Sequence, residues 1–402
     1  MKILDLNFDC LLRILQFCNE RDLANLCRAH WFFRQIIDQN IYSGKSLDLL
    51  MCGHRNEPII GKRTHGTLSY EQRLSIAQNW VEGRYQETEY FHHRKMFPTK
   101  VHLERELLYI THAGFLRIHK RIFNEPLQRR YLVEIATKNK SDIADFVQHR
   151  DSLFAGRVCG SCFIYEDDLV HEQRLHSPKE YLMCVNFAND VYVSSTDRCS
   201  KVWQRANEFG MVHLDLVQKL EHSFKALQFT SGGERFYGGL YTDVNRHALR
   251  EHDVESGCHT ILNSNSLSIY DLKLKDDHVV FTANFDTTFR MYDRRSNHDE
   301  AVWEDPFDSS FYCLDYDGLY GVLCGAKYHG RVNLYDIRVP GKLVQLFFPC
   351  RRRQNSSPVY SLACDSRYLF VTTDHNLRVF DFKGDYGISR DYSDIFNEMR
   401  RI

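Results

Sequence analysis

Residues 266–306 read SLSIYDLKLKDDHVVFTANFDTTFRMYDRRSNHDEAVWEDP, and this stretch decides the fold. It contains four runs rich in β-branched and aromatic residues, in which apolar and polar side chains alternate: 266–274, 279–286, 287–293 and 300–306. Turn-forming Asp, Asn and Ser residues lie between most of the runs. Alternation with a period of two is typical of β-strands, so the stretch predicts a unit of four short strands.

An aromatic residue, often followed by Asp, closes the third strand of this unit and recurs along the chain. It is seen at His119, Tyr165, Trp203, His252-Asp253, Tyr292-Asp293, Tyr335-Asp336 and Phe380-Asp381, in steps of 38 to 49 residues. A repeat of about 40–45 residues with an aromatic-Asp ending resembles the WD repeat, one blade of a β-propeller. We therefore predict a mainly β fold, a seven-bladed WD-repeat β-propeller preceded by a small all-α segment. The first two repeats lack the Asp, which leaves six or eight blades open.

The composition is that of an ordinary folded protein. The chain has 402 residues, 43% of them hydrophobic, and a net charge of −1. This charge predicts no bulk attraction to nucleic acid or to an anionic membrane, although a local basic patch would be compatible with it. Thirteen cysteines without a regular spacing favour a reducing compartment, the cytoplasm or the nucleus. The chain has no apolar run of about 18 residues, and Asp5 and Asp9 interrupt its first apolar stretch, so we expect no membrane span and no signal peptide.

Residues 4–42 predict three short helices. Leu11, Leu12 and Leu15 fall on one face of the first helix, and Asn19 is a plausible N-cap of the second. A segment of about 40 residues is near the lower limit of what folds alone. Its apolar surface is therefore expected to pack either on the rest of this chain or on a partner protein, and periodicity does not decide between the two.

Residues 6–37, LNFDCLLRILQFCNERDLANLCRAHWFFRQII, resemble the F-box. Asn7, Cys10 and Glu20 depart from the family pattern, in which Pro, Ile and Pro are usual. Together with the repeats, the whole chain resembles an F-box/WD-repeat protein of the dactylin type. This resemblance implies a non-catalytic substrate receptor of a Skp–cullin–F-box ubiquitin ligase, without a cofactor. The implied partners are a Skp-family adaptor, the cullin and RING subunit reached through it, and an unknown protein substrate. The expected adaptor contacts are Leu6, Leu11, Leu12, Ile14, Leu15, Leu23 and Leu26.

The expected domains are the F-box at 1–43, a helical linker at 44–83, the propeller at 84–383 and a tail at 384–402. Within the linker, Ser69 and Gln72 predict a capping box, and Gly83 predicts the helix end. Trp80 favours a helix packed on the propeller over a flexible tether. The alternating residues 84–92 are expected to supply the missing strand of the last blade and so close the ring.

In a propeller, the starts of the inner strands and the turns between second and third strands share one face. Repeat alignment puts Leu182 among the inner-strand starts. The predicted substrate-binding residues on this face are Arg198, Lys225, Tyr270, Phe285, Tyr312, Tyr328 and Tyr360. Two cations within an aromatic arc favour an aromatic, hydrogen-bonding surface over a phosphate pocket built from arginine forks. The alternative is that these rings only line the mouth of the propeller.

No residue pattern predicts catalysis or a metal site. Cys159 and Cys162 form a single CxxC without the second pair that a zinc site requires. Asp197, Asp243, Asp286 and Asp374 recur in turns, where Asp usually bonds to local backbone. His222 resembles a structural His between blades. Two rival functions stay open: a WD-repeat scaffold without ligase association, and a propeller enzyme with carboxylates or His facing its channel.

Overall fold

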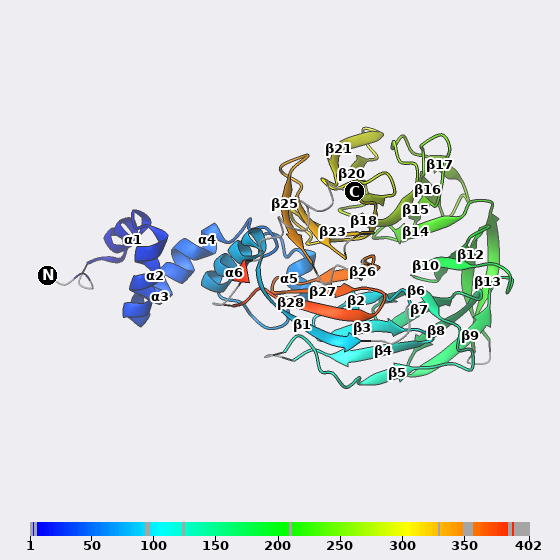
Figure 1. Cartoon of the computed structure of the whole chain (residues 1–402), viewed down its shortest axis with the longest axis horizontal. Helices are drawn as coiled ribbons and strands as arrows, with labels where there is room; N and C mark the ends of the chain where they lie inside the picture. Colours follow the sequence, from blue (N-terminus) through cyan, green and yellow to red (C-terminus); the bar gives the residue numbers. More distant parts are fainter. Residues whose placement is uncertain are drawn as a thin grey trace, which may run out of the picture.

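The propeller predicted from the repeats is confirmed. The structure is a computed structural model that describes residues 3, 6–92, 97–122, 125–208, 211–328, 330–348, 357–384 and 388–389. Seven antiparallel sheets surround a central channel (Figure 1). Most of the predicted tail, 384–402, and the Arg351–Arg353 run lie outside the described residues.

Six of the sheets are four-stranded blades formed by consecutive strands, innermost strand first. Blade one contains β2 (Val101–Leu103), β3 (Leu107–His112), β4 (Phe115–Lys120) and β5 (Val133–Ile135). Blade two contains β6 (Ile143–His149), β7 (Ser152–Arg157), β8 (Ser161–Glu166) and β9 (Leu169–Arg174). Blade three contains β10 (Leu182–Ala188), β11 (Val191–Thr196), β12 (Ser200–Glu208) and β13 (Met211–Leu220). Blade four contains β14 (Phe224–Phe229), β15 (Arg235–Leu240), β16 (Leu249–Asp253) and β17 (His259–Ile261). Blade five contains β18 (Ile269–Leu274), β19 (Val279–Asn284), β20 (Thr288–Asp293) and β21 (His298–Glu304). Blade six contains β22 (Phe311–Tyr316), β23 (Gly321–Ala326), β24 (Val332–Asp336) and β25 (Leu343–Phe347).

The seventh blade joins the two ends of the propeller sequence. It contains β26 (Ser361–Cys364), β27 (Tyr368–Thr372) and β28 (Asn376–Asp381), followed by β1 (Arg84–His92) and the short β29 (Ile388–Ser389). β1 pairs antiparallel with β28, with Gln86 opposite Asp381. Arg378 donates to Glu87 at 2.5 Å and to Glu89 at 2.7 Å across this pair. Residues 84–92 thus close the ring, as the sequence predicted.

The N-terminal helices form a small module with its own core. It comprises α1 (Phe8–Gln16), α2 (Glu20–Ala29) and α3 (Trp31–Ile37), and continues through a π-helical turn, η2 (Asp38–Tyr42), into α4 (Ser43–Lys45). Asn7 and Asn19 cap α1 and α2 by accepting the N–H groups of Cys10 and Asp22. In Figure 1 the module stands away from the blades, with α4 and α6 between them. None of the described helices is long and apolar enough to cross a membrane.

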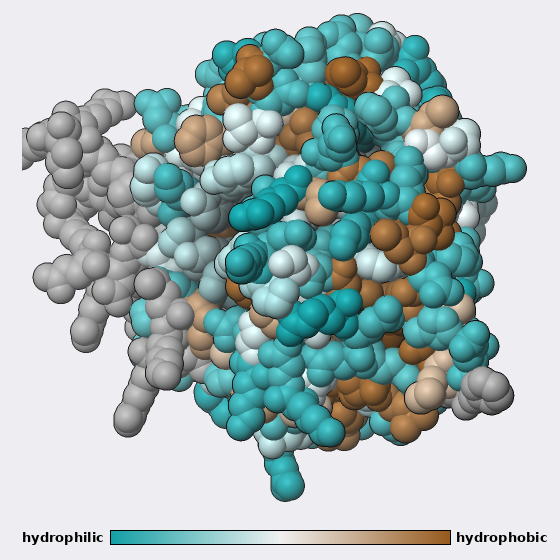
Figure 2. Space-filling view, turned by 90° about the vertical axis from the view of Figure 1, so that its right-hand side faces the viewer, coloured by the Kyte–Doolittle hydropathy of each residue, from teal (hydrophilic) through white to brown (hydrophobic). Residues whose placement is uncertain are grey.

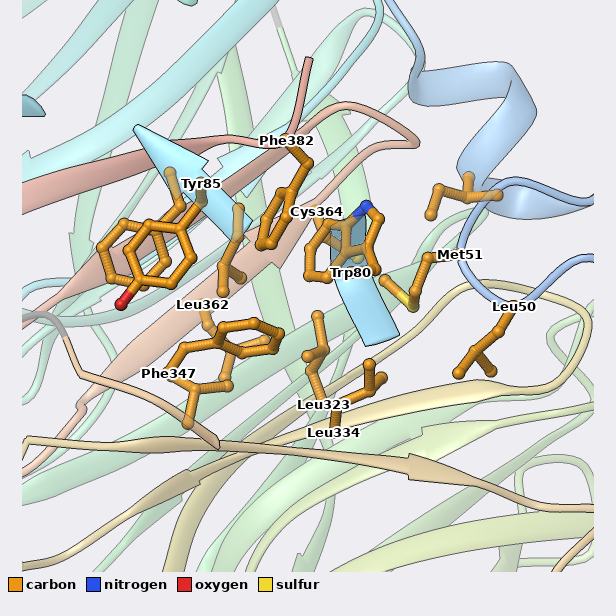
Figure 3. Packing of buried hydrophobic residues seen from close by; sticks show 14 of the residues in the cluster. Leu50, Met51, Trp80, Tyr85, Leu323, Leu334, Phe347, Leu362, Cys364 and Phe382 are labelled. Carbon is orange, nitrogen blue, oxygen red and sulfur yellow. The ribbon is translucent and has the colours of Figure 1, made fainter. Parts of the chain in front are cut away.

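The linker fixes the module to the propeller through α5 (Ile59–Arg63) and α6 (Tyr70–Glu82). The predicted capping box of Ser69 and Gln72 is present, and Gly83 ends α6 with a φ of +68°. Trp80 is fully buried, lies 3.6 Å from Phe382 in a ring stack, and donates its Nε1–H to the Ser366 carbonyl (Figure 3). The linker helix is therefore packed on the propeller and is not a tether.

The linker contacts one particular face of the propeller, which we call the lower face: the side of the turns between inner and second strands. Met51 donates its N–H to Asp317, and Ile60 donates to the Asp317 carbonyl, in the β22–β23 turn. Arg63 forms an ion pair with Asp315 at 2.7 Å. The opposite side, with the inner-strand starts, is the upper face.

Candidate functional site

Irregularities at the starts of the inner strands build the upper face. In five blades the register of the inner strand shifts by one residue near its start. The residues passed over are Ala144, Met183, Lys225, Tyr270 and Tyr312. A β-bulge leaves one residue outside the ladder and re-aims its side chain, so each of these five blades presents one side chain toward the mouth or the channel. Leu182 does begin β10, but its side chain is 0% exposed in the core, and Met183 occupies the bulge.

Four predicted rings form one contiguous group over the mouth. The ring centroids are 4.9 Å apart for Tyr270 and Tyr312, 6.3 Å for Tyr312 and Tyr360, and 6.1 Å for Tyr270 and Phe285. Tyr241 extends the group at 6.0 Å from Tyr270 and was not predicted. Burial, reinforced by the neighbouring Tyr241, raises the pKa of Tyr270 well above that of a free tyrosine. These hydroxyls thus stay protonated and available as hydrogen-bond donors at neutral pH.

A lysine joins the remaining predicted aromatic residue to this group. Lys327 Nζ lies 4.9 Å from the centroid of Tyr328 and 5.9 Å from that of Phe285. Both rings are more than two-fifths exposed, so they form an open part of the surface. Lys327 directly precedes Tyr328 in the same turn but was not predicted, because repeat alignment gives Tyr328 as the turn position. We call Tyr241, Tyr270, Phe285, Tyr312, Lys327, Tyr328 and Tyr360 the aromatic rim.

The two predicted cations do not belong to the aromatic rim. Arg198 lies exposed in the β11–β12 turn, where its N–H donates to Thr196 Oγ1. Lys225 lines the central channel together with Lys100 and Asp145. The cation of the aromatic rim is therefore Lys327, whereas Lys225 lies below it in the channel.

Three of the four recurring turn carboxylates have structural partners. Asp243 accepts from Arg250 at 2.5 Å, and Asp286 accepts from Arg290 at 2.9 Å. Asp197 accepts the N–H of Tyr181 at 2.8 Å. These bonds fix the turns of the upper face and, in two cases, neutralise an arginine that could otherwise bind an anionic ligand.

A histidine network fixes the upper side of blade three. His176 Nε2 lies 2.7 Å from Ser194 Oγ, which also accepts from Trp203 Nε1 at 2.9 Å, while Nδ1 lies 3.2 Å from Glu180. Burial, followed by the charge of Lys201, lowers the pKa of His176 to about 4. The network uses His176, whereas the sequence pointed to His222, whose ring packs against His259.

His176 and Glu180, with Cys199, also offer donor atoms within 4.8 Å of one another, a set that a zinc ion would accept. Both ring nitrogens of His176 already have hydrogen-bonding partners, which accounts for the arrangement without a metal.

The helical module divides the predicted adaptor contacts into two groups. Leu11, Leu15 and Leu23 are at most 1% exposed because they form the core that α1, α2 and α3 share, and as adaptor contacts they stay a prediction. Leu6, Leu12 and Leu26 are half-buried against that core. Ile14 is 44% exposed and remains a candidate contact.

Three exposed rings of the module were not among the predicted contacts. Phe17 is 78% exposed, Trp31 70% and Phe8 49%. Phe17 lies one helical turn after Ile14, which is the sequence signal that could have found it. Ile14, Phe17, Trp31 and Phe8, which we call the module's exposed apolar set, lie on the part of the chain that stands away from the propeller.

The side of the propeller away from the module also carries apolar residues. Figure 2 shows brown patches there, separated by hydrophilic surface. Exposed apolar residues of the outer strands β9, β13 and β17 are Leu169, Val170, Met211, Leu216, Val217 and Ile261.

Comparison with known proteins gives a consistent result. No protein-family model matches the chain. F-box/WD repeat-containing protein 4 of Homo sapiens is 28% identical over 321 residues, which cover 78% of this chain and 77% of the human protein. The Mus musculus protein of the same name is 26% identical over 321 residues, with the same shares. With a seven-bladed propeller behind a short helical module, these similarities make the chain a homologue of the F-box/WD-repeat proteins.

Proposed function

We propose that the chain is the non-catalytic substrate-recognition subunit of a Skp–cullin–F-box ubiquitin ligase. The helical module would dock on a Skp-family adaptor, which connects it to a cullin and a RING subunit. The propeller would hold the protein to be ubiquitinated. The similarity to two proteins named as F-box/WD repeat-containing supports the general role.

The observation that carries the proposal is the exposed apolar set of the module. Phe17 and Trp31 expose most of their surface, although the module already has a core of its own. Exposed rings of this kind are typical of protein interfaces, where aromatic residues carry much of the binding energy. The propeller does not cover them, which favours a partner protein over packing within the chain.

The upper face is the proposed substrate site. The aromatic rim supplies hydroxyl donors and flat apolar rings, the features that bind peptides with little loss of side-chain entropy. The chain's contribution to the reaction would be proximity, because a substrate lysine held near the charged ubiquitin carrier reacts at a raised effective concentration. The packed linker supports this, since it holds the module and the propeller in one fixed relation.

Co-purification of the full chain with a Skp-family adaptor tests the proposal. The variant is Phe17→Asp with Trp31→Ala, because both side chains are exposed and their loss leaves the core intact. Substitution of Leu11 or Leu15 would be uninformative, since it would unfold the module. Leu169→Asp, at an exposed site on β9 of the propeller, is the matched control.

Binding by the parent and by the control, with loss in the double variant, is the expected result. If the folded parent does not bind the adaptor, the ligase role is wrong, and a WD-repeat scaffold without ligase association takes its place.

A further inference from the structure

The central channel contains a cavity of about 580 Å³. It is lined by inner-strand residues of several blades and, at the lower face, by Ile59 and Arg63 of α5. This volume is within the range of small-molecule sites, which is about 300–1,000 Å³. The linker thus forms part of the cavity wall, so a ligand in the channel would touch both the propeller and the segment that carries the module.

Cationic side chains line this cavity. Lys100 comes from blade one, Lys225 from blade four and Lys273 from blade five, and Arg63 comes from the linker. Arg63 is paired with Asp315, and Lys100 lies 3.7 Å from Asp145. Within the described part of the chain, the ammonium groups of Lys225 and Lys273 have neither an ion pair nor a hydrogen bond.

The cavity's two inner carboxylates are engaged by the fold. Asp145 accepts the N–H of Val185, and Asp271 accepts the N–H of Leu314, so each one joins its blade to the next. These backbone bonds hold the carboxylates in place, and of the three lysines only Lys100 lies within ion-pair distance of one of them. Burial, together with the nearby charge of Lys100, lowers the pKa of Lys225, as expected of a cation short of counter-charge.

We propose that the channel is a binding site for a small anion bearing carboxylate or phosphate groups, held by Lys225, Lys273 and Lys100. Burial of the Lys225 ammonium without an ion pair is unfavourable, and an anion bound beside it reduces that penalty. Lysine offers point charges with three donors each, which suit a compact anion in a cavity. The site lies below the aromatic rim and meets it at Tyr270, which also lines the cavity, and it does not depend on whether the module binds an adaptor.

Thermal unfolding of the full chain tests the proposal, with inorganic phosphate and citrate as the probes. Each is compared with chloride at the same ionic strength, because phosphate and citrate also stabilise proteins by exclusion from their surfaces. The variants are Lys225→Met and Lys273→Met. The matched control is Lys219→Met, an exposed lysine on the outer strand β13.

Lys225→Met is expected to change thermal stability in opposite directions in chloride and in phosphate or citrate. In chloride, Lys225→Met raises Tm, because it removes a desolvated charge and keeps the apolar stem. With millimolar phosphate or citrate, the parent and Lys219→Met gain in Tm, and Lys225→Met loses at least half of this gain. Binding to the parent by calorimetry should weaken at least tenfold in that variant. A response to phosphate alone, or to citrate alone, identifies which of the two chemistries the site prefers.

An equal gain in the parent and in both channel variants would show an adventitious ion effect and overturn the proposal, as would the absence of any gain in the parent. If Lys225→Met does not fold, Lys273→Met gives the same reading from the neighbouring blade.

Discussion

The two faces of the propeller differ in how their side chains are used. On the lower face, linker residues such as Met51, Ile60 and Trp80 are buried and bonded to the turns of blades six and seven. On the upper face, the aromatic rim is half-buried or exposed, and its rings contact mainly one another. The difference indicates that the lower face holds the module, whereas the upper face keeps its apolar surface available for a ligand.

Truncating Trp80, which anchors the linker on the lower face, should cause the largest loss in the free energy of unfolding. Trp80→Ala would leave a cavity between Phe382, Phe347 and Met51 and would leave the Ser366 carbonyl with only the weak thiol donor of Cys52 (Figure 3). We expect a loss of about 3–5 kcal/mol in the free energy of unfolding, as for other buried Trp truncations. Urea unfolding followed by circular dichroism measures it. Trp31→Ala, at a 70% exposed site, is the control and should lose less than about 0.5 kcal/mol. A small loss for Trp80→Ala would mean that the linker only rests on the propeller.

The hydrogen-bond network of His176 on the upper face should make the free energy of unfolding depend on pH, with an effect smaller than that of Trp80→Ala. The pKa of His176 is about 4 in the folded chain, below the usual value of 6.5, because of burial and Lys201. The unfolded chain therefore binds a proton first as the pH falls, so stability is lost between about pH 6.5 and pH 4, by about 2–3 kcal/mol. His176→Gln should flatten this slope in a series of urea titrations, while His298→Gln, at an exposed site, should keep it. Equal slopes in all three proteins would remove His176 as the cause.

The sequence predicted well those features that depend on residues close together in the chain. The aromatic-Asp pairs define the blades because each lies at the end of a strand within one repeat, and the capping box of Ser69 and Gln72 lies within a single helical turn. Periodicity failed where a helix has apolar residues on two sides: Leu11 and Ile14 look alike in the sequence, but one faces the core and the other faces solvent.

Features that depend on distant segments were not predictable. The contact of Met51 and Ile60 with Asp317 joins segments more than 250 residues apart, and nothing periodic marks it. A one-residue bulge exchanged the roles of Leu182 and Met183, since repeat alignment carries an error of that size. Lys225 was placed correctly at an inner-strand start, but whether its side chain turned to the rim or to the channel depended on the bulge.

A polar contact of the lower face should have a smaller effect than Trp80. The Thr64 hydroxyl lies 2.7 Å from the Ile60 carbonyl and accepts the buried N–H of Ser366. Thr64→Val keeps the shape but leaves that N–H unpaired, so we expect a loss of about 1–2 kcal/mol. The control is Thr67→Val at an exposed site four residues from α5. If both variants unfold at the same urea concentration as the parent, this contact does not help to hold the linker.

The smallest effect on stability is expected at the aromatic rim. Phe285→Ala with Tyr328→Ala removes two exposed rings and their contacts with Lys327. Exposed cation–π contacts contribute about 0.5–1 kcal/mol and exposed rings bury little surface, so the loss should stay below about 1 kcal/mol. Urea unfolding of this double variant and of Trp80→Ala, measured side by side, compares the stability that the two faces contribute. A loss as large as that of Trp80→Ala would show that these rings brace the blades and only line the mouth, and the contrast between the two faces would then fail. A small loss leaves the rim without a structural reason to be aromatic, and ligand binding is the reason that remains.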